Sequence, residues 1–147
     1  QIDRIVSCID SKSSIAVLQG TESYLITEGK RKHIADYSYA EMLLRSKVLI
    51  TYFGITLFEG NLSGCSLITI NPTHYHSTLT AHCEKDFSIT NAGILDDITD
   101  QDLKTIIHGA MASPGNTVIK TADIISRINS NHTAFENYIE QLCLTVS

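Results

Sequence analysis

The middle of the chain carries apolar runs and polar breaks in a pattern that predicts a βαβ unit. Residues 48–51 and 66–70 are short runs of Val, Leu, Ile and Thr, which are typical of strands buried on both faces. Residues 55–62 between them have the length and composition of a short helix, which Gly64 ends. Two buried strands joined by a crossover helix should be parallel, with a right-handed connection.

Weaker patterns on either side complete the expected fold. We expect strands at residues 4–9, 15–18, 24–27 and 87–91, and helices at residues 34–46, 75–85, 102–111, 121–128 and 132–144. The basic run 30–32 is expected to be a solvated loop or a helix lead-in, and residues 92–93 a turn. Thr99 is expected to cap the helix that follows it.

No repeat, low-complexity tract or long linker divides the sequence. We therefore predict one α/β domain over residues 1–147, with a Rossmann-like parallel sheet flanked by helices. The hydrophobic content of 43% and the charged content of 18% are ordinary for a soluble globular domain.

Charge and cysteine usage exclude some classes of partner. The net charge of −5 argues against a nucleic-acid partner, because no basic surplus is present to neutralise phosphates. No apolar run is long enough to span a bilayer, so we expect no membrane span. The four cysteines have no metal-type or redox spacing, which is typical of reduced thiols in a cytoplasmic protein.

Candidate chemistry lies at the carboxyl ends of the two central strands, where α/β sheets bind their ligands. Gly54 lets a ligand approach the backbone, and Ile55 and Thr56 open a helix whose free N–H groups favour an anion. Glu59 lies about one turn further on, where a carboxylate would suit the two hydroxyls of a diol. The same residues also match a capping box, Thr56-x-x-Glu59, and the pattern alone leaves both interpretations open.

The loop after the second central strand is rich in histidine. His74 and His76 form a His-x-His motif, and His82 follows at a spacing that is weak support for a zinc site. We therefore predict no metal site. Hydrogen bonding of His74 and His76 to a sugar or a phosphate at the helix start is the favoured interpretation.

The segment Gly54-x-Thr56-x-x-Glu59, followed by Gly64, an apolar strand and a polar His loop, resembles the donor-binding half of GT-B glycosyltransferases. The closest resemblance is to the peptidoglycan-type N-acetylglucosaminyl transferases and to the nucleotide-sugar hydrolases of pseudaminic acid synthesis. It extends over about residues 33 to 93.

This resemblance implies a UDP-sugar donor, metal-independent chemistry without a cofactor, and a role in surface polysaccharide biosynthesis. The glycine turn and helix start would hold the diphosphate, Glu59 the ribose, and the backbone of His33 and Ile34 the base. The loop after the second strand would meet the sugar. The candidate nucleotide-sugar-binding residues are His33, Ile34, Thr51, Gly54, Ile55, Thr56, Glu59, Thr73 and Tyr75.

Three functions remain open on the sequence. The first is the donor-binding half of a two-domain glycosyltransferase, inactive alone because the acceptor's general base would come from a missing N-terminal domain. The second is a nucleotide-sugar hydrolase in which His74 or His76 acts as the base or proton shuttle. The third is a non-catalytic α/β module that binds a partner or a small effector. The expected protein partner is the missing N-terminal domain or, in a homodimer, a second copy of the chain.

Overall fold

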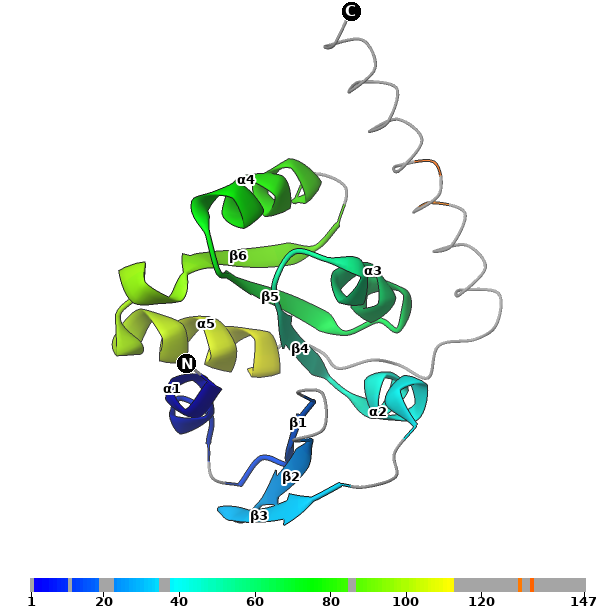
Figure 1. The fold of residues 1–147 in the computed structure, drawn as a ribbon, viewed down its shortest axis with the longest axis vertical. Coiled ribbons are helices and arrows are strands. Elements are labelled where there is room, and N and C mark those ends of the chain that lie inside the picture. Colours follow the sequence, from blue (N-terminus) through cyan, green and yellow to red (C-terminus); the bar gives the residue numbers. More distant parts are fainter. Residues whose placement is uncertain are drawn as a thin grey trace, which may run out of the picture.

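The computed structural model describes residues 2–10, 12–18, 23–34, 38–84 and 87–112, together with Ser130 and Thr133 (Figure 1). The elements of the first half are α1 (Ile2–Ser7), β1 (Ile15–Val17), β2 (Tyr24–Thr27), β3 (Lys30–His33), α2 (Tyr39–Arg45), β4 (Val48–Thr51) and α3 (Ile55–Leu62). Those of the second half are β5 (Ser66–Asn71), α4 (His74–Cys83), β6 (Ile89–Ile94), the short 3-10 helix η1 (Leu95–Asp97) and α5 (Asp100–Ala112).

The predicted βαβ unit is confirmed. β4 and β5 pair in parallel on either side of α3, and β6 adds a third parallel strand to give the order β4-β5-β6. Central β5 is buried along almost its whole length, as expected, whereas β4 is only half-buried because it lies at the edge of this sheet.

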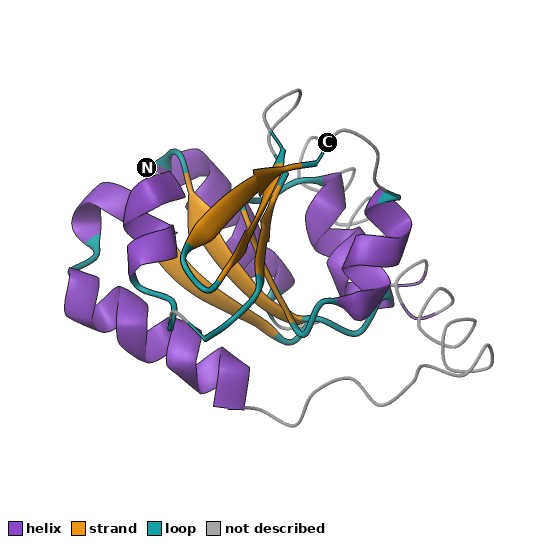
Figure 2. Ribbon diagram, turned by 90° about the horizontal axis from the view of Figure 1, so that it is seen from below, coloured by secondary structure: helices purple, strands orange, loops and turns teal. Residues whose placement is uncertain are grey.

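Helices cover both faces of the parallel sheet (Figure 2). On one face, Ile68 and Ile70 of β5 pack with Cys8, which directly follows α1, and with Leu103 and Ile107 of α5. On the other face, Leu67 of β5 packs with residues of α2 and α3, including Leu43 and Leu57. This alternation follows from the period of two along a strand, which sends successive side chains to opposite faces. The chain is therefore an α/β protein with a parallel three-stranded sheet between helices.

Gly64 ends α3 as predicted. Its φ of +77° is a left-handed conformation, and the N–H groups of Gly64 and Cys65 donate to the carbonyls of Asn61 and Gly60, both at 3.0 Å. These two bonds form a Schellman motif, which satisfies the last carbonyls of the helix. The chain then turns directly into β5.

The prediction of a strand at residues 4–9 is wrong, because residues 4–7 belong to α1 and residues 8–9 form the turn after it. Ile5, Cys8 and Ile9 follow a helical spacing and pack onto the face of the sheet that α5 covers. Arg4 fixes the helix in place, since its guanidinium donates to the carbonyls of Leu95 and Ile98 and pairs with Asp100 at 2.7 Å.

The basic run 30–32 is also not a loop or a helix lead-in. It belongs to β3, the edge strand of a separate antiparallel sheet with the order β1-β2-β3. Glu28 and Gly29 both have positive φ, +51° and +74°, and connect β2 to β3 as a two-residue hairpin. Exposed basic side chains suit such an edge, because they discourage pairing with another strand.

Other predicted boundaries move by a few residues. The helix expected at 34–46 begins only at Tyr39, because Ser38 caps α2 and the residues before position 34 belong to β3. The turn expected at 92–93 is wrong, since both residues lie within β6. There Gly93, with a φ of +88°, accommodates one extra residue in the pairing with β5.

The C-terminal part of the prediction is tested only up to α5. That helix forms over the expected residues, and the hydroxyl of Thr99 accepts the backbone N–H of Asp102 at 3.1 Å, as a cap should. The helices expected at 121–128 and 132–144 lie outside the described residues, except for Thr133, which is helical. Across the described ranges, no helix has the combination of length and apolar character that a membrane span requires.

We expect Gly60→Ala to destabilise the protein by about 1–3 kcal/mol, the usual cost of overpacking a core. A methyl group at Gly60 would lie 2.3 Å from Cδ2 of Leu49 and 2.9 Å from Cδ2 of Leu67, so these packed leucine side chains, or α3 itself, would have to shift. Unfolding in urea measures the difference. The matched control is Gly109→Ala in α5, where a methyl group meets no atom within 4 Å. Equal stability of the two variants would contradict this account of the packing between α3 and the sheet.

Candidate functional site

The carboxyl edge of the parallel sheet brings the starts of two helices together. β4 and β5 are paired in register, with Thr51 opposite Thr69, so the connections that follow them lie side by side. The first connection leads to α3 through Gly54, and the second leads to α4 through Thr73. Most of the predicted site residues belong to these two connections or to the first turns of the two helices.

The side chain of Asn71 holds this edge together. Asn71 is 1% exposed, and its Oδ1 accepts the backbone N–H of Phe53 at 3.1 Å and the hydroxyl of Thr80 at 3.3 Å. Its Nδ2 donates to Oδ1 of Asn91 at 3.1 Å. One amide therefore joins β5 to the connection after β4, to α4 and to β6.

Asn91 extends the same network on β6. Its Nδ2 donates to the carbonyl of Ser77 in α4 at 3.1 Å, and its Oδ1 also accepts the N–H of Gly93 at 3.1 Å. One hydrogen bond joins the two amides, and it links the partners of Asn71 to those of Asn91. Asn71 is buried, so little water is present to replace a partner that it loses. The network fixes where the backbone before Gly54 lies.

Gly54 is the N-cap of α3, and the fold gives no reason for a glycine there. Its backbone is extended, with φ 165° and ψ −177°, which other residues also adopt. A methyl group at this position would only touch Cε2 of Tyr52 at 4.0 Å. Because glycine has no side chain, no side-chain cap accepts a hydrogen bond from the first amides of α3, in contrast to the Ser38 cap of α2 and the Thr73 cap of α4. The backbone carbonyl of Gly54 accepts the N–H of Leu57 at 3.0 Å instead, and the N–H groups of Ile55 and Thr56 come before that bond. The next residue, Ile55, is 76% exposed.

The alternative that Thr56 and Glu59 form a capping box is wrong. Since Gly54 is the N-cap, Thr56 already lies inside the first turn of α3. Glu59 instead accepts a hydrogen bond through Oε2 from the hydroxyl of Tyr39 at 2.9 Å. Burial is the main cause that raises the pKa of the Tyr39 phenol; a hydrogen bond with Thr56 lowers it, and the bond to Glu59 raises it again. The phenol is therefore protonated at neutral pH and acts as a donor.

An aromatic cluster lies at the start of α4, beside the connection that follows β4. His76, in the first turn of α4, has Tyr52 and Tyr75 beside it, with ring centroids 6.2 Å and 5.8 Å away in edge-on arrangements. The hydroxyl of Thr73 is 2.8 Å from Nδ1 of His76 and accepts the backbone N–H of the same residue at 3.4 Å. Tyr52 is 57% and Tyr75 68% exposed, so these rings present a surface to solvent.

The remaining predicted residues are divided between this edge and the antiparallel sheet. Thr51 ends β4, and His74 is an exposed residue at the start of α4. His33 ends β3, and Ile34 follows it with its N–H already donated to the carbonyl of Ser23 at 2.9 Å. A base held by this segment would therefore depend on its other backbone groups.

Four residues of the site were not identified from the sequence: Tyr39, Tyr52, Asn71 and Asn91. The asparagines had a usable signal, since each lies at or near the carboxyl end of a predicted strand. Tyr39 had none, because its partner Glu59 is twenty residues away in the sequence.

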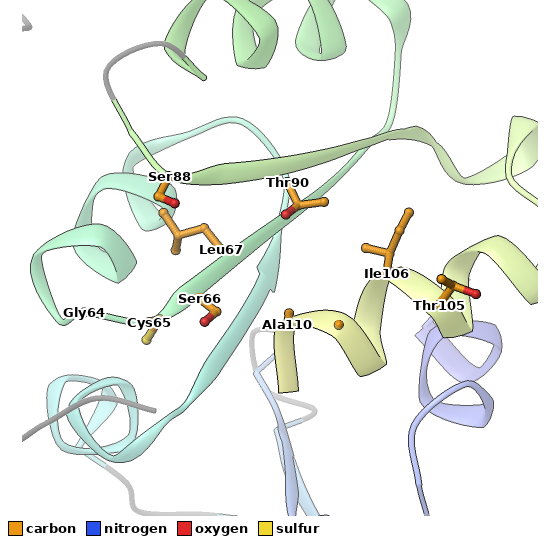
Figure 3. A pocket seen from close by; sticks show the side chains of 10 residues that line it. Gly64, Cys65, Ser66, Leu67, Ser88, Thr90, Thr105, Ile106 and Ala110 are labelled. Atoms are coloured by element: carbon orange, nitrogen blue, oxygen red, sulfur yellow. The ribbon is translucent and has the colours of Figure 1, made fainter. Parts of the chain in front are cut away.

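A separate hollow of about 410 Å³ lies at the opposite, amino end of β5 and β6 (Figure 3). Residues from the start of these strands and from the C-terminal half of α5 line it, among them Ser66, Ser88, Thr90 and Gly109. None of the predicted site residues belongs to it. Among the residues that the structure describes, no group of three His, Cys, Asp or Glu side chains is placed to hold a metal ion.

Comparison with known proteins gives no relative for this chain: no family model, no curated protein and no solved structure matches it. Its function has to be argued from the site.

We expect Asn71→Ala to reduce the free energy of unfolding by about 2–4 kcal/mol, because it leaves the N–H of Phe53 without its partner and removes the bonds to Thr80 and Asn91. Thr80 and Asn91 keep their bonds to the carbonyls of His76 and Ser77. Denaturant unfolding followed by circular dichroism measures this loss. Thr78→Ala is the control, since Thr78 is an exposed residue of α4 with a hydroxyl bonded only locally, to the carbonyl of His74. A loss below about 1 kcal/mol for Asn71→Ala would show that the network is not a major source of stability.

Proposed function

We propose that this chain is the nucleotide-sugar-binding domain of a GT-B-type glycosyltransferase of surface polysaccharide biosynthesis, and that it binds a UDP-sugar at the carboxyl edge of β4 and β5. One observation carries the proposal. Glu59 is held by Tyr39 one turn beyond the start of α3, and that start carries a glycine for which the fold has no need.

The diphosphate would lie against the start of α3. Backbone N–H groups and the positive end of the helix dipole attract an anion there, with each such interaction contributing about 0.3–1 kcal/mol. Gly54 allows the phosphate oxygens to approach the backbone of Ile55 and Thr56 closely. Such a site orients a diphosphate without needing a positive net charge, which this chain lacks.

The ribose would lie at Glu59. A carboxylate repels phosphate and accepts hydrogen bonds from hydroxyl groups, so it favours the neutral part of the nucleotide over its anionic part. Its position one helical turn from Gly54 matches the order of groups in a nucleoside diphosphate, with the ribose beside the phosphates. The base would then extend toward the segment of His33 and Ile34.

The sugar would meet the start of α4. Thr73, His74 and Tyr75 offer hydrogen-bonding groups, and the exposed rings of Tyr52 and Tyr75 offer apolar faces against which a pyranose ring can pack. During transfer, an acceptor hydroxyl bonds to the anomeric carbon and gives its proton to a general base, while the bond between that carbon and the diphosphate breaks and its electrons leave with UDP. Amides already directed at that phosphate stabilise the charge as it develops.

UDP at a hundred times its dissociation constant should stabilise the folded chain by about 2.7 kcal/mol and raise the midpoint of thermal unfolding by about 5–10 °C. Gly54→Ala and Glu59→Ala should fold normally and lose most of this shift, since neither change disturbs the core. Gly109→Ala is the control that keeps it. CMP and NAD, compared at equal concentration, test the selectivity for UDP. The absence of a UDP shift in the unmodified chain, or its full retention in both site variants, would contradict the proposal.

A second candidate function, a nucleotide-sugar hydrolase, is favoured by the environment of His76. Thr73 fixes its ring through Nδ1, which leaves Nε2 to exchange a proton with water or with a leaving group. The hydroxyl can donate or accept, so it can support either tautomer of the ring.

If the chain is a hydrolase, incubation with UDP-N-acetylglucosamine should release UDP and free sugar in a 1:1 ratio, and His76→Gln should slow this by about 10²–10⁴-fold. Chromatography of the products measures both. His82→Gln, in the last turn of the same helix, is the control. If the chain binds UDP but releases no UDP from the sugar nucleotide, the hydrolase function is excluded and only the donor-binding function remains.

A further inference from the structure

We infer that Tyr39 is a positioning residue for Glu59 and that it gives the site a preference for ribose over 2′-deoxyribose. The inference rests on the proposed function, because it concerns the same nucleotide site. Its basis is the 2.9 Å hydrogen bond from the Tyr39 hydroxyl to Oε2 of Glu59, which joins α2 to α3.

Tyr39 is itself well fixed. It is the first residue of α2, directly after the Ser38 cap, and its side chain packs against the core cluster that includes Leu43, Leu57 and Leu67. The ring therefore has little freedom, and its hydroxyl marks a nearly constant point beside α3.

A glutamate on a helix surface otherwise samples many rotamers. Holding it in one of them costs side-chain entropy each time a ligand binds. Tyr39 holds the carboxylate in the folded protein before any ligand arrives, so binding no longer has to supply that cost. Preorganisation of this kind acts only through interactions that Glu59 itself makes.

The geometry also decides which hydroxyls are recognised. An ionised carboxylate has about four lone-pair positions. The phenol takes one of them on Oε2, and the others remain to accept hydrogen bonds from a diol. Because the phenol is a donor at neutral pH, it aligns the carboxylate as an acceptor. A nucleotide that lacks the 2′-hydroxyl leaves one of these directed positions without a partner, which a polar site penalises.

The test compares UDP with 2′-deoxyuridine diphosphate on the full chain, by titration calorimetry, in a double-mutant cycle of Tyr39→Phe and Glu59→Ala. The unmodified chain should bind UDP about tenfold more tightly than its deoxy analogue. Glu59→Ala should bring this ratio close to one, and Tyr39→Phe should reduce it about threefold or more. Tyr39→Phe should have no further effect on the ratio in the Glu59→Ala background, because it acts through that carboxylate.

The ratio is measured on one protein at a time, so a general loosening of the fold cancels from it. Tyr24→Phe, which removes a phenol from the antiparallel sheet, is the matched control and should keep the original ratio. An unchanged ratio in Tyr39→Phe, or an equal loss with and without Glu59, overturns the role of Tyr39 while UDP binding stands. Failure of the unmodified chain to bind UDP overturns the proposed function and this inference together.

Discussion

Asn71 ends the central strand with a side chain that is almost completely buried, and groups from three other parts of the chain bond to its amide. An amide in this position cannot fall back on water, so every partner that it lacks costs free energy. The backbone at Phe53 and the side chains of Thr80 and Asn91 must therefore stay within reach of one point. Hydrophobic burial holds the helices on the sheet, but it does not specify the path of the loops; this amide does.

That constraint explains how a short chain presents a defined edge. The hydrogen bond from the N–H of Phe53 to Asn71 fixes the connection after β4. The next residue, Gly54, has an extended backbone, and a side chain at this position would meet no close neighbour. α3 then starts in a fixed direction, and its first residue, Ile55, is exposed. On the other side, Thr73 starts α4 and orients His76. The exposed groups are movable side chains on a backbone whose position is already determined.

The sequence predicted this region well because each of its signals is local. The apolar runs of β4 and β5 and the left-handed Gly64 lie within a few residues of the structure that they specify, and α3 has the predicted bounds. Where tertiary contacts decide, the prediction failed. A six-residue apolar segment near the N-terminus suits a strand or a helix equally, and its packing with α5 makes it α1.

The basic run of β3 is a strand only because the Glu28–Gly29 turn pairs it with β2, and Gly93 was misinterpreted because a glycine with positive φ serves a bulge as well as a turn. At the site, the position of Gly54, Thr56 and Glu59 on one helix was predictable, since it depends on spacing alone. The bond between Tyr39 and Glu59 was not, because it depends on how α2 lies against α3.

Some residues near the sheet are required by the packing and hydrogen bonding of the fold, whereas others have no such structural reason. Gly60 has to be small because Leu49 and Leu67 approach it, and Asn71 has to be an amide because of its partners. No such reason applies to the glycine at position 54, or to the large exposed side chains of Tyr52, Ile55 and Tyr75. Exposed apolar side chains are ordinary when they are scattered, but these belong to the two connections that leave one edge of the sheet side by side, or to the first turns of the helices that follow. An edge that combines unneeded backbone access, uncovered rings and a prealigned carboxylate is better explained by a ligand than by the stability of the fold.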